Sequence, residues 1–468
     1  MIKSKILVVI TGNEYIRNYI QSDALRALES EYDCYFLGSD QITIREQLIN
    51  KPNFLGFYTE DPKQKGRSYS YFNVLMYKNR NQCSSFKFRT YRTYYKPESF
   101  YNTIKLILSE SVKLKFDFLR KFKEKSKVRI FSRTPFFNYY ESKFKKLHLI
   151  NPLLLSAIEK NKIDIVLFPS SAYDPIGVDI VQACRKFHIP SLFLIDNWDN
   201  LSSKSILFEK PDYLGVWSQQ SLEHATEIQG IEKSNIFILG TPRFNHYFKD
   251  RDRDLPSSFN FRYILFVGTA VAFDEAGIIT KINQVMEDNQ HIFSGVKLLY
   301  RPHPWRHSKD SIADKDLPHL VIDPQLKDAY LKKDASYAIQ PSLDYYPSLI
   351  KNSEFVMGGL TSMLIETLIF KKPYFALAYD DGINLTSPHN VLKYYVHFKG
   401  LENVEAIKFC TELQDFPSQF IEQWNERGDI NSKKVDDQRE YYLSHDQNME
   451  YKDKLKSIVE NIITKDAH

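Results

Sequence analysis

The residues best suited to bind a phosphate lie in the stretch 358–366, which reads Gly-Gly-Leu-Thr-Ser-Met-Leu-Ile-Glu. Glycines after an apolar strand, Gly359 among them, let the backbone approach a ligand closely. Thr361 or Ser362 is expected to cap the next helix, and the free N–H groups of a helix start favour a phosphate. Glu366 lies one turn deeper on the same face, where its carboxylate can accept the two hydroxyls of a ribose. The stretch therefore predicts a nucleotide site.

A second candidate is the sequence Arg-Pro-His-Pro at positions 301–304, which follows an apolar run. The two prolines restrict this loop and hold Arg301 and His303 in a fixed direction. A cation beside an imidazole suits a phosphate or a departing nucleotide. Gly268 and Thr269 end an earlier strand, where the glycine permits a tight turn and the threonine is placed to bind phosphate or the transferred group.

Candidate acceptor-side residues follow two other apolar runs. The first is the polar sequence 196–204, which reads Asp-Asn-Trp-Asp-Asn-Leu-Ser-Ser-Lys. Asp196 or Asp199 could act as the general base that activates an acceptor hydroxyl, with Asn197 between them. A rival set of residues follows the first strand and is expected to face the same cleft. It consists of Gly12, Asn13 and Glu14.

Two further acidic groups need separate interpretations. Glu275 is another candidate base, although an acid at a helix start is also favoured by the helix dipole. Asp250, Asp252 and Asp254 alternate with arginines, a pattern that indicates salt bridges more than a metal site. We therefore expect no metal. The chain also lacks the phosphate-loop, zinc-protease and nucleophile-elbow motifs.

Length and composition limit the class of protein. A chain of 468 residues suggests two domains. The net charge of +5 is too small for a dedicated nucleic-acid binder, so no nucleic-acid partner is expected. Four cysteines without a short Cys-x-x-Cys spacing exclude a disulfide scaffold. No apolar run reaches the ~18 residues of a membrane span, and Ile6–Ile10 is shorter than a signal-peptide core of ~7–15 residues, so a cytoplasmic protein is expected.

Apolar runs alternate with helix-like segments along most of the chain, which favours parallel sheets with helices on both faces. A stretch rich in charge, proline and serine after residue 250 resembles a linker. The predicted fold is α/β, with two doubly wound Rossmann-like domains facing a central cleft. We expect an N-terminal acceptor-side domain over 1–255, a donor-binding domain over 256–435 and a closing helix over 436–468.

Residues 62–148 interrupt the first domain and are expected to form a helical insertion. Within 111–150 there are twelve lysines and arginines against three acids, with phenylalanines and tyrosines between them. The stretch is a solvated basic face, a basic-aromatic surface that meets anionic lipid or a lipid-linked acceptor, or a surface for nucleic acid. The second interpretation predicts peripheral association with the inner face of the cell membrane.

The order of these motifs resembles the GT-B glycosyltransferases of bacterial surface-polysaccharide synthesis. The most similar families are the CDP-glycerol glycerophosphotransferases and the polysialyl and Kdo transferases, which share a His-Pro motif. The resemblance spans roughly residues 160–380. It rests on Gly-Thr-Pro-Arg at 240–243, Arg-Pro-His-Pro at 301–304, Thr-Ser at 361–362 with the glutamate at 366, and Lys-Pro at 372–373.

The resemblance implies a metal-independent transferase without a further cofactor, which moves a sugar from a CMP-, CDP- or UDP-linked donor to a surface polysaccharide or glycolipid. By the family pattern, His303 meets the donor phosphate, Thr361 and Ser362 bind phosphate, and Glu366 holds the ribose. The acidic pair before Gly277 matches the polysialyltransferase motif only with an inserted alanine. Glycerophosphotransfer from CDP-glycerol, non-hydrolysing 2-epimerisation of a nucleotide sugar and a non-catalytic glycan-binding scaffold stay open as alternatives.

Overall fold

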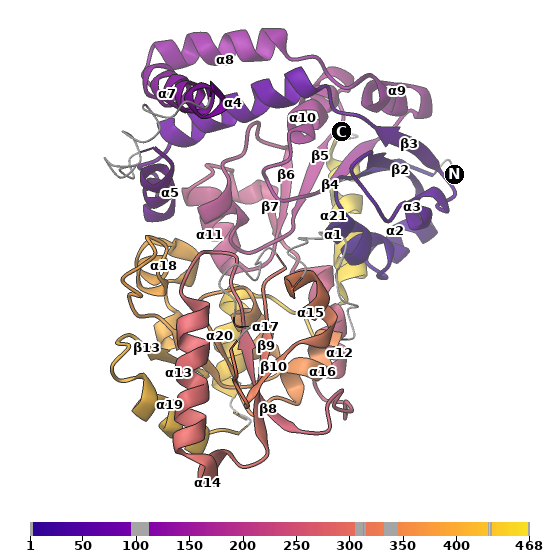
Figure 1. Ribbon diagram of the computed structural model, residues 1–468. Coiled ribbons are helices and arrows are strands. Elements are labelled where there is room, and N and C mark those ends of the chain that lie inside the picture. The colour runs from indigo at the N-terminus through magenta and orange to yellow at the C-terminus, as the bar shows by residue number, and fades with distance from the viewer. Residues whose placement is uncertain are drawn as a thin grey trace.

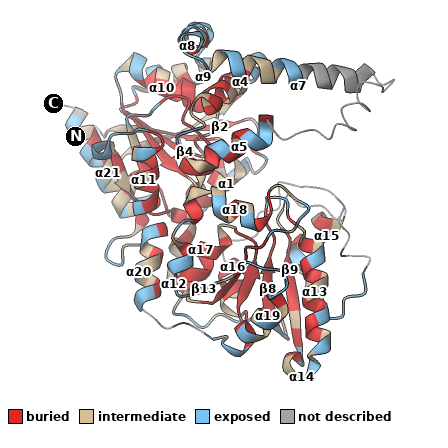
Figure 2. Ribbon diagram, turned by 90° about the vertical axis from the view of Figure 1, so that its left-hand side faces the viewer, coloured by how far each residue is buried: buried red, intermediate tan, exposed pale blue. Residues whose placement is uncertain are grey.

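The structure is a computed structural model that describes residues 3–94, 112–304, 312, 315–331, 345–428, 430 and 433–466. It contains two parallel β-sheets, one above the other in Figure 1, and helices cover the faces of both. Buried residues concentrate in the two sheets and on the helix faces turned toward them (Figure 2).

The upper sheet has seven parallel strands in the order β3-β2-β1-β4-β5-β6-β7. Its central strands are apolar throughout, and Ile6–Ile10 is fully buried, as expected for a sheet covered on both faces. The order reverses between β1 and β4, so a crevice opens at the carboxyl ends of these strands. The strands are β1 (Lys5–Ile10), β2 (Asp33–Ser39), β3 (Phe54–Tyr58), β4 (Ile165–Ser170), β5 (Ser191–Ile195), β6 (Tyr213–Val216) and β7 (Ile236–Ile238).

Short helical segments connect these strands. Two of them, η1 and η2, are π-helical turns near the carboxyl ends of β1 and β5, and such turns are frequent at functional sites. The segments are α1 (Asn13–Tyr15), η1 (Ile16–Ile20), α2 (Arg26–Glu31), α3 (Glu46–Ile49), α9 (Pro152–Asn161), α10 (Ile176–Phe187), η2 (Asn200–Lys204), α11 (Gln219–Glu227) and η3 (Lys233–Asn235).

The lower sheet repeats this winding with six parallel strands in the order β10-β9-β8-β11-β12-β13. Two doubly wound sheets facing each other confirm the predicted α/β fold of GT-B architecture. The strands are β8 (Arg262–Val267), β9 (Val296–Arg301), β10 (Leu320–Ile322), β11 (Val356–Gly358), β12 (Tyr374–Leu377) and β13 (Ile407–Cys410). The helices are α13 (Glu275–Asp288), α14 (Gln290–Phe293), α15 (Pro324–Leu331), α16 (Tyr345–Lys351), α17 (Met363–Ile369), α18 (Pro388–Tyr394), η6 (Val396–Phe398), η7 (Leu401–Asn403) and α19 (Phe416–Asn425).

The chain passes between the two halves twice. The first passage contains η4 (Pro242–Phe244) and α12 (Asn245–Asp250), and position 255 lies in it, before β8. The second passage joins α20 (Lys433–Tyr442), which packs on α17, to α21 (Tyr451–Asp466), which packs on α2 of the upper half. The single closing helix expected over 436–468 is therefore wrong. The segment forms two helices because the first packs into the hydrophobic core of the lower domain and the second packs into the core of the upper domain.

The insertion at 62–148 is helical where it is described and lies over the upper sheet (Figure 1). Aromatic rings hold its helices together, as in the parallel stacking of Tyr71 on Phe144 at 4.2 Å between ring centroids. Its helices are α4 (Pro62–Lys78), α5 (Ser84–Tyr94), α7 (Val112–Phe131) and α8 (Phe136–Leu147). Residue 111 and the side chains of 112–121, part of the predicted basic surface, lie outside the described residues.

Candidate active site between the two sheets

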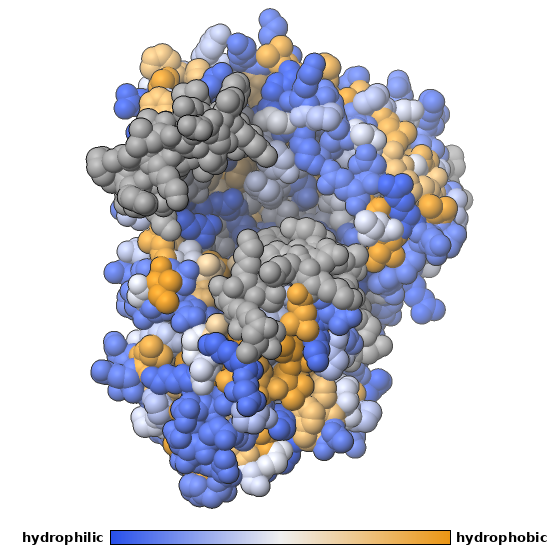
Figure 3. All heavy atoms as spheres, viewed as in Figure 1, coloured by the Kyte–Doolittle hydropathy of each residue, from blue (hydrophilic) through white to orange (hydrophobic). Residues whose placement is uncertain are grey.

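A cavity of about 600 Å³ lies between the two halves, and both contribute to its wall. The surface is hollowed there in Figure 3, between the upper and lower domains. The upper half supplies residues from α5 and from the loop after β5. The lower half supplies the loops after β8, β9, β11 and β12. The polar and charged residues of the wall include Arg89, Arg92, Asn197, Asp199, Lys204, His303, Thr361, Ser362, Thr386 and His397.

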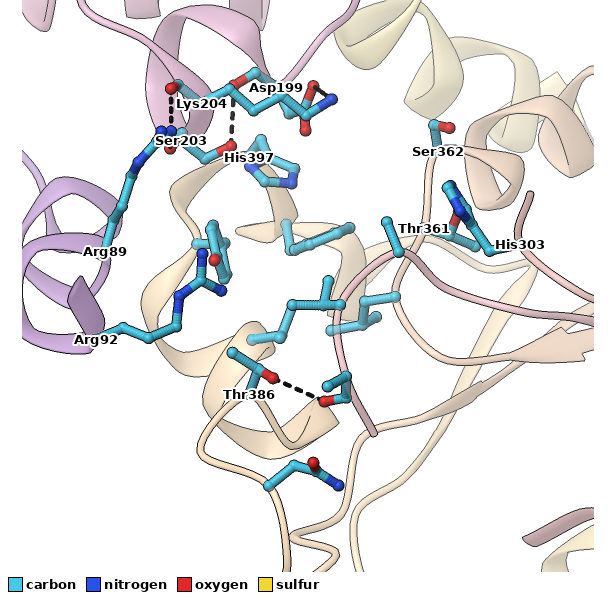
Figure 4. Close-up of a pocket in the computed structure, with 18 of the residues that line it drawn as sticks. Arg89, Arg92, Asp199, Ser203, Lys204, His303, Thr361, Ser362, Thr386 and His397 are labelled. Atoms are coloured by element: carbon cyan, nitrogen blue, oxygen red, sulfur yellow. Dashed lines mark hydrogen bonds and ion pairs between the residues drawn. The ribbon is translucent and has the colours of Figure 1, made fainter. Parts of the chain in front are cut away.

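Three of the predicted donor-side residues meet in this cavity. His303, Thr361 and Ser362 lie next to one another on one side of it (Figure 4). Ser362 occupies the N-cap position of α17, but its side chain does not cap the helix. This differs from the expected capping role and leaves the hydroxyl at the cavity wall. An imidazole and two hydroxyls side by side can donate hydrogen bonds to a phosphate.

Glycines let the loops of this side come together. Gly358 has φ +153°, and a Cβ atom there would collide with the carbonyl oxygen of Val267 on the neighbouring strand. A Cβ atom on Gly359 would lie 2.8 Å from the Thr269 side chain. A Cβ atom on Gly268 would lie 2.8 Å from the backbone nitrogen of His303. Both glycines therefore serve close backbone packing behind the cavity wall.

Glu366, expected to hold a ribose, does not reach the cavity. Its side chain is fully buried, and its two carboxylate oxygens accept hydrogen bonds from Arg243 at 2.6 Å and from the Tyr247 hydroxyl at 3.0 Å. Both partners come from the first passage between the domains. The prediction of ribose binding is therefore wrong for this arrangement, because the carboxylate is already committed to an ion pair.

Arg301 is likewise turned away from the cavity. It is buried, and its guanidinium donates to the Tyr346 hydroxyl at 2.7 Å and lies 5.2 Å from the centre of the same ring. Burial lowers the pKa of Arg301, but the hydrogen-bonded Tyr346 and the nearby carboxylates outweigh it, and the pKa is raised overall. Of the Arg-Pro-His-Pro pair, only His303 is placed to touch a ligand.

Glu275 and Thr269 form a closed hydrogen-bond cluster. The Glu275 carboxylate accepts from the Thr269 backbone at 2.8 Å and from the Tyr300 hydroxyl at 2.7 Å. The Thr269 hydroxyl donates to the carbonyl of Val271 at 2.8 Å. Both side chains are almost fully buried and lie outside the cavity wall. The predicted roles of Glu275 as a base and of Thr269 as a phosphate ligand are therefore wrong, because both side chains stabilise the loop after β8. Residues 270–272 of that loop line the cavity instead.

On the acceptor side, Asn197 and Asp199 line the cavity, and Lys204 lies 3.0 Å from the Asp199 carboxylate. Asp196 lies just behind them, at the end of β5, and accepts a hydrogen bond from Asn18 at 3.1 Å. Burial raises the pKa of Asp196, and Arg243 opposes this shift most strongly.

Glu14 and Asp196 interact electrostatically at the ends of β1 and β5. Burial, followed by the nearby charge of Asp196, raises the pKa of Glu14 to about 7. A carboxylate with a near-neutral pKa suits proton transfer at physiological pH. Asn13 instead binds the backbone of Thr43 at 3.0 Å, and a Cβ atom on Gly12 would collide with the Glu14 carboxylate. Of the three residues after β1, only Glu14 carries a titratable side chain, and it lies outside the cavity wall.

Sequence reasoning missed several residues of the cavity. Arg89 and Arg92 come from α5 of the insertion, and His397 comes from η6. Burial lowers the pKa of His397 to about 3, so its imidazole is neutral. No local pattern marks these residues, because only the packing of the insertion onto the lower half turns α5 toward the cleft.

Among the described residues, no group of three or more His, Cys, Asp or Glu side chains is arranged to hold a metal ion. Within the same ranges, no helix combines the length and the apolar character needed to cross a membrane.

No family model and no curated protein matches the chain. Solved structures of low identity are similar to it over nearly their whole length. The UDP-GlcNAc 2-epimerase of Methanocaldococcus jannaschii has 13% identity and a TM-score of 0.45, with 98% of this chain and 99% of that chain covered. The UDP-N-acetylglucosamine 2-epimerase of Rickettsia bellii has 10% identity and a TM-score of 0.47, with 99% and 98% covered. MurG of Acinetobacter baumannii has 10% identity and a TM-score of 0.42, with 99% of each chain covered. The function has to be argued from the residues of the cavity.

Proposed function

We propose that the protein is a glycosyltransferase that moves a sugar from a nucleotide-activated donor to an acceptor hydroxyl of a surface polysaccharide or glycolipid. The observation that carries the proposal is the pairing of two chemistries across one cavity. His303, Thr361 and Ser362 can stabilise a departing phosphate on the lower side. Asp199 lines the upper side, and Glu14 and Asp196 lie at the strand ends behind it.

The proposed reaction is a direct displacement. A carboxylate takes the proton of the acceptor hydroxyl, either Asp199 at the cavity wall or Asp196 or Glu14 behind it, and the acceptor oxygen forms a bond to the anomeric carbon. The bond between that carbon and the donor phosphate breaks, and its electron pair stays on the phosphate oxygen. His303 and the two hydroxyls donate hydrogen bonds to the charge that develops there. Closure of the two domains excludes water from the reaction.

A thermal-shift panel of CMP, CDP, UDP, GDP and their sugars tests this proposal. A nucleotide that binds the folded state raises the melting temperature by mass action. We expect one nucleotide class to stabilise the protein and Thr361→Ala/Ser362→Ala to reduce that shift. A matched control is Thr280→Ala on α13, whose hydroxyl lies outside the cavity. Lack of stabilisation by any nucleotide would contradict the proposal and favour a glycan-binding scaffold.

Epimerisation of a nucleotide sugar is a second candidate. The observation that favours it is the proximity of Glu14 and Asp196, because two carboxylates with shifted pKa values also suit removal and return of a proton at carbon. Product analysis separates the candidates. A new glycosidic bond identifies the transferase, an epimerised nucleotide sugar identifies the epimerase, and a phosphodiester identifies glycerophosphotransfer.

We also propose that the outer face of α8 contacts an anionic membrane. Phe136 and Tyr139 are 51% and 63% exposed, and Lys143 and Lys146 continue the same helix face. Exposed aromatics beside lysines fit the interface of an anionic bilayer. A lipid-linked acceptor would then lie on the same side of the protein as the insertion.

Co-sedimentation with vesicles tests the membrane contact. Phosphatidylcholine vesicles containing phosphatidylglycerol should carry the protein down, and pure phosphatidylcholine vesicles should not. Phe136→Ser/Tyr139→Ser should lower the bound fraction several-fold. The control is Tyr91→Ser, an exposed aromatic of α5. Equal binding of both variants would exclude this face.

A further inference from the structure

The cavity presents groups that can bind an anion on two opposite walls. His303, Thr361 and Ser362 lie on one side in Figure 4, and Arg89 and Arg92 lie on the other. A nucleotide-activated sugar carries its phosphate charge at a single place, between nucleoside and sugar. If the donor phosphate binds at the first wall, no charge of the donor is left to pair with the arginines of the second wall.

Among the described residues, the arginines of this second wall have no acidic partner. Arg89 donates to the backbone carbonyls of Ser203 and Lys204, and its guanidinium lies 5.7 Å from the Phe72 ring. Within the part of the chain that the structure describes, no carboxylate pairs with Arg89 or Arg92. A half-buried guanidinium without a counter-charge is costly, and a bound anion removes that cost.

Contacts with the lower domain hold the arginines at the cavity. Phe88 stacks on Tyr394 with 4.6 Å between ring centroids, and the Ser85 hydroxyl accepts a hydrogen bond from the Val396 nitrogen at 2.8 Å. Residues 88 and 92 lie one turn apart on α5, so docking of Phe88 fixes the direction of Arg92 as well. The insertion thus supplies a wall of the site and does more than cover the upper sheet.

We propose that Arg89 and Arg92 form a second anion subsite, which binds a carboxylate or phosphate of the acceptor saccharide. This inference rests on the proposed transferase and gives its second substrate a chemical class, an anionic glycan. The anionic group lies across the cavity from the donor phosphate. The acceptor hydroxyl is thereby directed toward the space between the two walls, where Asp199 lines the cavity.

Binding of matched charged and neutral saccharides tests the subsite. The carboxylate pair is a tetrasaccharide of alternating glucuronate and N-acetylglucosamine against neutral chitotetraose. The phosphate pair is glucose 6-phosphate against glucose. Each is titrated calorimetrically into the full chain, with and without UDP or CDP. In at least one pair, we expect the anionic saccharide to bind at least about tenfold more tightly than the neutral one, the size expected for a hydrogen bond to a charged group. Its affinity should fall as the salt concentration rises.

Two variants of α5 assign the effect. Arg92→Ala, an exposed position, should weaken the anionic probe about tenfold. Lys87→Ala, an exposed cation of the same helix that does not line the cavity, should leave it unchanged. Equal binding of charged and neutral members in both pairs, absence of anionic binding, or an Arg92→Ala protein that binds like the parent would overturn the subsite. If the protein binds a nucleotide but not the anionic saccharides, only the subsite is rejected. If it binds an anionic saccharide but no nucleotide, the proposed function is rejected.

Discussion

At the scale of single residues, His303 is the predicted imidazole that lies at the cavity wall, where it can donate a hydrogen bond to a ligand. Two prolines flank it in the loop after β9, and the Gly268 loop packs against its backbone. The imidazole is therefore held in place before a ligand arrives. Such fixed donors act strongly on charge that develops during a reaction.

His303→Ala should lower kcat/KM by about 10²–10³, the effect of removing one fixed donor from a developing negative charge. The melting temperature should stay close to that of the parent, because the side chain is only partly buried. His291→Ala on α14 is the matched control, an exposed histidine of the same domain. Turnover near the parent's value would remove His303 from the proposed mechanism.

Glu14 provides a pH-dependent prediction. Its pKa is raised from 4.5 to about 7, so the folded protein binds a proton there more tightly than the unfolded chain does. The stability from this proton is complete below pH 4.5 and is lost as the pH rises through about 7. Relative to Glu14→Gln, the parent's free energy of unfolding should fall by up to ~3 kcal/mol over this window.

Urea denaturation of the parent and of Glu14→Gln at several pH values measures this difference. The same titration should appear in the activity if Glu14 is the base, with an apparent pKa near 7 that the glutamine variant lacks. A constant stability difference between the two proteins across the window would show that Glu14 does not titrate there.

The residue scale also shows where sequence reasoning failed. The sequence places Glu366 and Arg301 in a nucleotide site, but each side chain is paired with a residue far away in the chain. Arg243 pairs with Glu366 across 123 positions, and Tyr346 pairs with Arg301 across 45. Such partners are set by tertiary packing, which no local spacing reveals. His303 and Asp199 follow strands that are apparent from the sequence, and both line the cavity as predicted.

At the scale of elements, α5 is the helix that joins the insertion to the lower domain. Phe88 is 5% exposed and contacts Tyr394 and Tyr395, while Ser84 and Ser85 both donate to the Tyr394 carbonyl. These contacts end at the start of η6, so they also position the neighbouring His397 at the cavity.

Phe88→Ala should release α5 from α18 without unfolding either sheet. Hydrogen exchange should quicken several-fold in α5 and α18 and stay unchanged in β1 and β8, because the lost contact is local. Tyr91→Ala, on the same helix but 44% exposed, should change neither element. Exchange that quickens equally throughout the protein would indicate that Phe88 supports the global fold instead.

At the scale of the whole molecule, most central strands were predictable from continuous apolar runs. The strands that the runs did not reveal are β2, β3, β10 and β13. Three of these, β3, β10 and β13, are edge strands, and their residues are mostly only partly buried. An edge strand needs less apolar sequence, so its signal is weak. β2 begins with Asp33 and contains Gly38, and both residues shorten its apolar run.

The Arg243–Glu366 ion pair links the first passage between the domains to the lower core. Glu366→Ala leaves a largely buried guanidinium without its partner and should cost about 3–5 kcal/mol of stability. Nucleotide affinity at low temperature, where the variant stays folded, should change little. As a control, Glu405→Ala removes an exposed partner of Lys434 and should cost at most ~1 kcal/mol. A stable Glu366→Ala protein with weakened nucleotide binding would restore the ribose interpretation.

The two passages between the domains lie side by side. A Cβ atom on Gly240, which has φ +76°, would lie 2.6 Å from the Ser444 carbonyl oxygen, and the rings of Phe248 and His445 stack at 3.6 Å between centroids. Two adjacent chain links permit rotation about one axis and resist twisting about others. The contact between α5 and α18 lies away from these links in Figures 1 and 2. For a given rotation it moves through a longer arc than the links do, so any rotation of the two domains about these links would act most strongly on the cavity wall that carries Arg89 and Arg92.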